Sequence, residues 1–314
     1  MSEDFINKNK KMDNFFDKNK YVELVLSKIR ERAEKTKGKL YIDINGKLLK
    51  DDFAERIFPW YESDLKKKII IALRHEVEIL VCVNASVIIE NTPMTKKWTP
   101  GVQHIDFTLK RIETVTGIKP NLVITNINPE DMYDVIYNFE KTFQKKWCKV
   151  WENYLKRWFP FNKSYLLSEN GFWNDDHIPI MKKIALITWI WEESWKFATA
   201  VWQIYQDHWI GLESSYCMFQ TLPLSEVDSK NPINQAWAKR RDNESLALDD
   251  FWETIEESSQ DNLNTLNDLL WDVIEKDNLI KSYEKTSDMI ICPTFECIKN
   301  IEEVEKLAKK EMEK

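Results

Sequence analysis

The chain has 314 residues, of which 45 are Lys or Arg and 52 are Asp or Glu, so its formal net charge at pH 7 is −7. This acidic balance argues against nucleic acid as the main partner, because neutralising phosphates requires a basic surface. No apolar run reaches the roughly 18 residues that a membrane-spanning helix needs, and the polar N-terminus does not resemble a secretory signal. We therefore expect a cytoplasmic protein that binds neither nucleic acid nor membrane.

The cysteines and histidines form no recognisable metal or disulfide pattern. The five cysteines are scattered, and only Cys292 and Cys297 lie close together, without a nearby His or Cys to complete a zinc site. The four histidines form no pair at helical spacing. We expect reduced thiols and no metal site.

Residues 1–20 are polar and rich in Lys and Asn, and they predict a disordered lead-in. From residue 21, helical spacing of apolar residues alternates with short apolar runs that end at turn signals. In chain order, these patterns predict a helix over 21–38, a strand over 39–44, a helix over 65–75, a strand over 78–83, a helix over 106–115, a strand over 121–125, a helix over 129–145, short strands near 148–150 and 164–167, a strand over 183–188 and a helix over 194–207.

Strands that alternate with helices of these lengths predict an α/β fold with Rossmann-like layers and a mostly parallel sheet. The run 183–188 is apolar without alternation, which is typical of a central strand buried on both faces. We expect an α/β region over 21–240, and a division into two sub-domains near residue 160 is left open. A mainly helical region follows over 241–314, with helical spacing in 249–277 and 298–314 and one strand at 289–292.

The loop after the central strand is where an α/β sheet of this kind binds ligands. It reads Thr188-Trp189-Ile190-Trp191-Glu192-Glu193-Ser194-Trp195-Lys196. A phosphate cradle needs backbone N–H groups that face inward, and three indoles beside two carboxylates oppose that arrangement. Taken literally, this loop predicts an aromatic cluster packed under a helix.

Several segments resemble a bacterial family of longer proteins, known as domain of unknown function 1846. The matching segments occur in the order of the family and are 39–41, 46–48, 56–60, 84–85, 123–125, 168–173, 219–221, 231–234 and 248–250. Family members continue past the point that matches Lys314, so the resemblance implies that this chain lacks their C-terminal part. In the family, the loop after the central strand is rich in glycine and ends in Gly-Ser-Gly-Lys.

Set against the family, seven tryptophans stand at glycine positions: Trp60, Trp147, Trp158, Trp173, Trp189, Trp191 and Trp195. The chain contains 14 Trp and only 6 Gly, whereas an average usage of about 7% predicts roughly 22 Gly. The resemblance suggests that UGA codons meaning glycine in the source organism were translated as tryptophan. The alternative is a divergent relative with genuine tryptophans. The codons decide between the two, since UGG at every position would exclude recoding.

With glycine at 189, 191 and 195, the loop becomes a Gly-rich turn that ends in a lysine at a helix start, which is the geometry of a phosphate cradle. We then expect a nucleotide, or another small phosphorylated ligand, to be held by Thr188, Trp189, Trp191, Ser194, Trp195 and Lys196. The match to a P-loop is incomplete, because Phe197 replaces the magnesium-binding Ser or Thr. Glu192 and Glu193 also stand where the family has Pro and Gly.

Three further residues are candidates to line the same cleft. Glu169 follows a predicted strand, with an exposed turn carboxylate as the alternative. Asn231 and Asn234 open a predicted helix, where their amides would either bind ligand or cap the helix. No catalytic set is recognisable, so the reaction stays unassigned. The chain is interpreted as a binder of a nucleotide or phosphorylated metabolite; the alternative is a non-catalytic interaction protein, a homo-oligomer included, with a degenerate loop.

Overall fold

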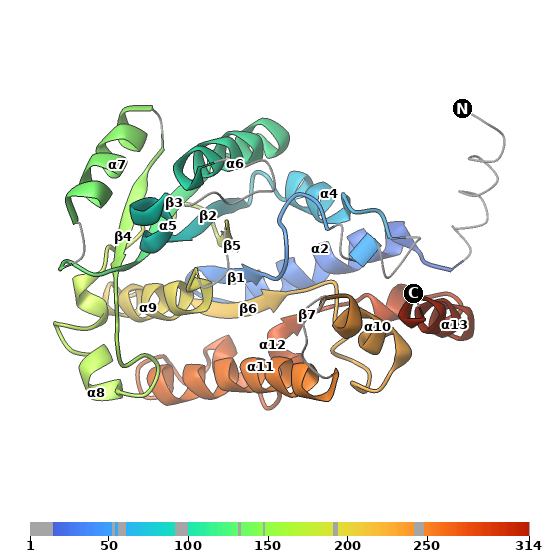
Figure 1. Ribbon diagram of the computed structural model, residues 1–314. Coiled ribbons are helices and arrows are strands. Elements are labelled where there is room, and N and C mark those ends of the chain that lie inside the picture. Colours follow the sequence, from blue (N-terminus) through green and yellow to red (C-terminus); the bar gives the residue numbers. More distant parts are fainter. Residues whose placement is uncertain are drawn as a thin grey trace.

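The computed structural model describes residues 15–51, 54–55, 61–91, 100–130, 133–146, 148–190, 194–241 and 248–313, with backbone alone for 240–241 and 248–258. Its centre is a seven-stranded sheet with the strand order β4-β3-β2-β5-β1-β6-β7, in which every pairing is parallel (Figure 1). The strands are β1 (Leu40–Ile44), β2 (Val77–Asn84), β3 (Asn121–Ile127), β4 (Val150–Tyr154), β5 (Ile184–Trp189), β6 (Ser215–Phe219) and β7 (Ile290–Ile291).

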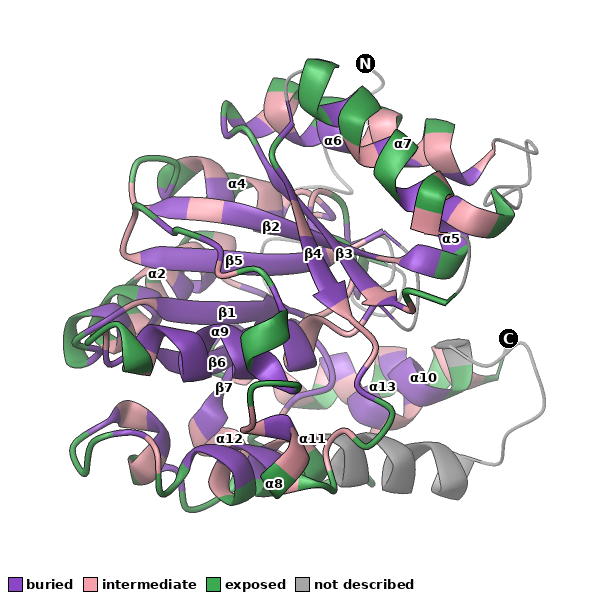
Figure 2. Cartoon of the chain, turned by 90° about the vertical axis from the view of Figure 1, so that its left-hand side faces the viewer, coloured by how far each residue is buried: buried purple, intermediate pink, exposed green. Residues whose placement is uncertain are grey.

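Helices cover both faces of the sheet, and the strands between them are almost completely buried (Figure 2). One face packs against α2 (Lys18–Lys35), α4 (Leu65–Ala72), α5 (Ala85–Glu90), α6 (Gly101–Thr116), α7 (Tyr133–Lys146), α10 (Pro232–Arg241) and α13 (Ile301–Met312). The other face packs against α8 (Lys163–Leu166), α9 (Lys196–Trp209), α11 (Leu248–Leu270) and α12 (Thr286–Met289). The short 3-10 helices are η1 (Phe172–Asn174), η2 (Leu279–Ser282) and η3 (Phe295–Cys297). The predicted α/β fold with Rossmann-like layers is confirmed.

The strand order contains a reversal at β5. The chain moves from β1 past the position of β5 to β2, and continues outward to β3 and β4 with its helices on one face. It then returns to β5, between β2 and β1, and crosses β1 to β6 through α9 on the opposite face. Right-handed crossovers that run in opposite directions require opposite faces. The carboxyl end of β5 is therefore a topological switch point, the usual ligand position in such sheets.

Local signals account for most element boundaries. Helix α2 begins at Lys18, three residues before the predicted start, because the Asp17 side chain accepts a hydrogen bond from the Lys20 N–H and the neighbouring Phe16 is buried. The C-terminal region, predicted to be mainly helical, adds β7 to the same sheet beside β6. Strands from both sides of residue 160 belong to this one sheet. No helix in the described ranges is long and apolar enough to span a lipid bilayer.

One predicted strand is wrong. Residues 164–167 were expected to be extended, but Lys163–Leu166 forms the short helix α8. The Asn162 side chain caps it by accepting a hydrogen bond from the Tyr165 N–H at 3.1 Å. A run of three apolar residues suits either structure, and a capping residue before it favours the helix.

Candidate functional site

The candidate loop lies at the switch point, between the carboxyl end of β5 and the first turn of α9. Residues 191–193, and with them Trp191, lie outside the described residues. Ser194, Trp195 and Lys196 are described, and they bring the chain from the sheet edge into α9. The described part of the loop therefore consists of its two ends, residues 188–190 and 194–196.

Trp195 has an unusual backbone conformation. It is the N-cap of α9 with φ 52° and ψ 37°, in the left-handed region, and its side chain makes no capping hydrogen bond. A residue with a Cβ atom pays roughly 1–2 kcal/mol in this region. The other non-glycine residues with positive φ in the described part of the chain are Asn91 and Asn126, and asparagine tolerates the conformation. Position 195 therefore has a backbone suited to glycine.

The Trp195 indole packs on the turn that follows β4. Its ring centroid lies 5.6 Å from that of Phe159, and Phe159 in turn lies 6.4 Å from Phe197 in the first turn of α9. These aromatic contacts hold the turn 157–161 against the start of α9. The expected packing of an aromatic side chain of this loop under neighbouring structure is thus present at Trp195.

The Lys196 side chain reaches from α9 to the carboxyl end of β1, the strand next to β5. As the first residue of α9, it directs its ammonium group to the Asp43 carboxylate and donates a hydrogen bond to the Ile44 carbonyl at 2.9 Å. Both side chains are largely buried. Asp43 was missed by sequence reasoning, although a carboxylate inside the otherwise apolar run of β1 was a signal for it. The positive charge of Lys196 lies at the switch point but is neutralised by Asp43.

The remaining described loop residues lie at or near the carboxyl ends of the strands. Thr188 is buried in β5, and its hydroxyl has no hydrogen-bond partner among the described residues. Trp189 ends the strand opposite Cys82 of β2. The Ser194 carbonyl accepts a hydrogen bond at 3.1 Å from the hydroxyl of Thr125, at the carboxyl end of β3. The structure thus brings together Thr188, Trp189, Ser194, Trp195 and Lys196.

Of the three other predicted site residues, Glu169 lies apart from this loop. Glu169 is exposed in a turn whose neighbour Leu167 accepts a hydrogen bond from Tyr205 of α9. Tyr205 is nine residues after Lys196, about 13 Å along a helix that rises 1.5 Å per residue. Glu169 therefore lies beside the far half of α9.

Asn231 and Asn234 use their amides within the fold. Asn231 caps the start of α10 by accepting from the Ile233 N–H, and it donates to Glu305 of α13 at 2.9 Å. Asn234 is buried and exchanges hydrogen bonds with both backbone groups of Leu224, which fastens the loop after β6 to α10. Both side chains therefore have structural partners, and Asn231 is the one that caps the helix, as the alternative expected.

A second polar cluster follows β4. The Lys156 ammonium lies 2.8 Å from Asp175 Oδ1, and the two side chains are 1% and 0% exposed. The Tyr154 N–H also donates to Asp175 Oδ1, at 2.6 Å. Burial raises the pKa of the Asp175 carboxyl to about 6, although the Lys156 charge acts in the opposite direction. Neither residue was singled out from the sequence, because they are separated by a turn, a helix and a 3-10 helix.

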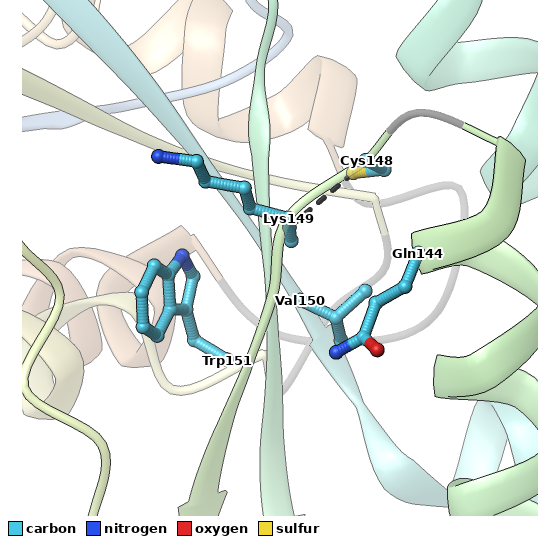
Figure 3. A pocket seen from close by; sticks show the side chains of 5 residues that line it. All are labelled: Gln144, Cys148, Lys149, Val150 and Trp151. Atoms are coloured by element: carbon cyan, nitrogen blue, oxygen red, sulfur yellow. Dashed lines mark hydrogen bonds between the residues drawn. The ribbon is translucent and has the colours of Figure 1, made fainter.

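A surface pocket of about 360 Å³ lies at the opposite, amino-terminal end of β4. It is lined by Gln144, Cys148, Lys149, Val150 and Trp151, and Figure 3 shows Lys149 and Trp151 on the other side of the strand from Val150 and Gln144. Burial raises the pKa of the Cys148 thiol to about 11, so it is protonated at neutral pH. This pocket offers no reactive group and is far from the switch point.

Metal and thiol chemistry find no support among the described residues. All five cysteines are buried and unbonded to one another. Burial raises the pKa of the Cys82 thiol, the one beside the candidate loop, to about 12. Within the described ranges, no group of three or more His, Cys, Asp or Glu side chains is arranged to hold a metal ion.

Comparison with known proteins shows which family the chain matches. The family described as "Domain of unknown function DUF1846, N-terminal" matches residues 14–314. A UPF0371 protein of Streptococcus equi subsp. zooepidemicus (strain H70) is 30% identical over 226 residues, and one of Streptococcus pyogenes serotype M5 (strain Manfredo) is 29% identical over 222 residues. Each alignment covers 71% of this chain but 44% of the relative, so the chain matches less than half the length of these proteins.

Proposed function

We propose that this chain, which belongs to the family described as Domain of unknown function DUF1846, binds a nucleotide or another phosphorylated metabolite at the loop 188–196. The supporting observation is the position of Lys196: a largely buried lysine in the first turn of the helix that starts at the switch point of the sheet. The partial positive charge of a helix N-terminus and a lysine at the same point both favour an anion. The reaction is not assigned.

In this arrangement, Asp43 competes with the phosphate for Lys196. The Asp43 carboxylate neutralises the ammonium, and the Trp195 side chain stands at the N-cap position, where anions approach the N–H groups of α9. A bound phosphate would therefore gain from a weaker Asp43 contact and from a smaller residue at 195. These two residues set the affinity of the site in the proposal.

The proposal predicts opposite effects for two substitutions. Thermal unfolding is measured with inorganic phosphate, AMP and ATP, each compared with the same variant without ligand. A ligand at about 100 times its Kd stabilises a protein by about 2.7 kcal/mol, which should raise Tm by several degrees. Lys196→Ala should abolish that rise, whereas Asp43→Asn should increase it, because the ammonium is then no longer neutralised.

The control is Lys163→Ala, which removes an exposed lysine paired with Asp272 and should leave the ligand-induced rise unchanged. If none of the three compounds raises Tm in the unmodified chain or in Asp43→Asn, phosphate binding at this loop is excluded. An equal loss in Lys163→Ala and Lys196→Ala would show that binding depends on overall charge and not on this site.

One observation favours the alternative of an interaction protein. Trp173 and Trp209 are 44% and 57% exposed, and their ring centroids lie 6.0 Å apart. Exposed aromatic groups that cluster in this way are typical of contact surfaces. Sedimentation velocity distinguishes the cases: this alternative predicts a concentration-dependent dimer that Trp173→Ser with Trp209→Ser dissociates. A monomer at all concentrations would leave the exposed tryptophans without this explanation.

A further inference from the structure

Three buried polar atoms lack a partner at the carboxyl-terminal end of β4 and in the segment that is hydrogen-bonded to it. Asn153 is 0% exposed, and both its Oδ1 and its Nδ2 lack a hydrogen-bond partner among the described residues. The Oδ2 atom of Asp175 is likewise buried and without a partner there. The other oxygen of this carboxylate is bound to the Tyr154 N–H, the residue next to Asn153. The Asp175 carboxylate is thus bound to the residue that follows Asn153 on β4, the edge strand of the sheet.

Unpaired polar atoms in a protein interior require a physical reason. Each destabilises the fold when it is buried without a partner, and native structures contain few of them. The available groups are one amide donor, one amide acceptor and one carboxylate acceptor, beside the Lys156 charge. A hydroxyl group both donates and accepts, so neighbouring hydroxyls of a sugar or polyol complement this set.

Hydrogen bonds and an aromatic contact connect the surroundings of this cluster to the candidate loop. Thr125 precedes Asn126 on β3, the strand next to β4, and its hydroxyl binds the Ser194 carbonyl of the loop. The Lys156 carbonyl accepts a hydrogen bond from the Phe159 N–H, and the Phe159 ring packs on Trp195. A ligand held by its phosphate at α9 would therefore reach Asn153 along the edge of β3 and β4.

We propose that Asn153, Asp175 and Lys156 form a subsite for the hydroxyl-bearing part of the phosphorylated ligand. The inference rests on the proposed function and narrows it to sugar phosphates and nucleotides, as opposed to simple phosphate esters. The three side chains are enclosed in this structure, so the ligand reaches them when the turn 157–161 moves. Phe161 at the tip of this turn is 92% exposed, whereas Phe159 packs on Trp195 and Phe197, so the movement must break these two aromatic contacts.

The test compares two phosphate monoesters that differ in their hydroxyl groups. Isothermal titration with ribose 5-phosphate and with monoethyl phosphate is carried out on the unmodified chain, Asn153→Leu and Asn138→Leu. We expect ribose 5-phosphate to bind at least ten-fold more tightly than monoethyl phosphate. Asn153→Leu should remove this difference and leave the affinity for monoethyl phosphate unchanged. Asn138→Leu, the same change at an exposed position of α7, should preserve it.

Each other outcome overturns a defined part of the proposal. Equal affinities for the two esters in the unmodified chain would exclude the subsite and leave the phosphate site standing. No binding of either ester would exclude both. If Asn153→Leu keeps the ten-fold difference, the unpaired amide is satisfied by water and has no part in recognition. Should Asn153→Leu not fold, as judged by circular dichroism, Asn153→Ser removes the amide without added bulk and is held to the same criteria.

Discussion

Replacing Lys156 by methionine is expected to destabilise the protein by about 3–5 kcal/mol at pH 8, the usual cost of removing one partner of a buried ion pair. The substitution leaves the Asp175 carboxylate buried without its cation, since the two side chains are 1% and 0% exposed. The methionine fills a similar volume, so the loss reports the charge and not a cavity. Urea unfolding at pH 8 measures it.

The loss should be smaller at pH 5, because Asp175 can then take up a proton. Burial already raises the pKa of this carboxyl to about 6 in the folded protein, above the roughly 3.9 of an unfolded chain. Removing Lys156 removes a charge that lowers the pKa, so the pKa rises further in the variant. The folded state then binds the proton more tightly than the unfolded state, and its stability falls as pH rises through the folded pKa.

Two variants serve as controls for Lys156→Met. Lys163→Met breaks an exposed ion pair with Asp272, and it should change the stability little at either pH, because solvent screens exposed pairs. Lys156→Met combined with Asp175→Leu removes both charges and should recover much of the stability. An equal loss at pH 5 and pH 8 in Lys156→Met would show that the carboxyl does not titrate in this range.

At position 195, glycine is expected to give a more stable protein than alanine, by about 1–2 kcal/mol. Both substitutions remove the indole and its contact with Phe159, but only alanine keeps a Cβ atom at φ 52°. The comparison of Trp195→Gly with Trp195→Ala therefore isolates the backbone conformation. Thermal or urea unfolding of the two variants measures the difference.

The same pair at Trp189 provides the control. Trp189 lies in β5, in extended backbone, so glycine there should be less stable than alanine by about 0.5–1 kcal/mol. The same order of stability at both positions would contradict a special role of the left-handed backbone at 195. Glycine more stable than alanine at 195, but less stable than alanine at 189, supports our proposal that glycine belongs at 195 through UGA recoding. The codon itself decides that question.

Local sequence patterns were sufficient for most of the elements. The uninterrupted apolar residues 184–187 predicted a central strand over 183–188, and this segment forms β5 in the middle of the sheet. The period of the apolar residues decides between helix and strand because it depends on the backbone geometry of each segment alone. The pattern was too short to decide for Lys163–Leu166, where the cap at Asn162 favours the helix.

The side-chain contacts of the candidate site could not be predicted from local patterns, because they join residues that are far apart in the chain. Lys196 meets Asp43 across 153 positions of the chain, because β5 inserts next to β1 in the sheet. Asn234 looked available for a ligand, but its amide fastens the loop after β6. Lys156 and Asp175 form their buried pair only when the chain returns past the free edge of β4.

The sequence by itself determined the family, the α/β class and the location of the loop, since these follow from motif order and from the period of the apolar residues. Only the tertiary structure decided which charges face each other, that Asn153 is buried without a partner, and that Trp195 adopts a left-handed backbone. Strand order and packing bring distant residues together, and the same packing supplies the energy that holds a strained or unpaired group in place.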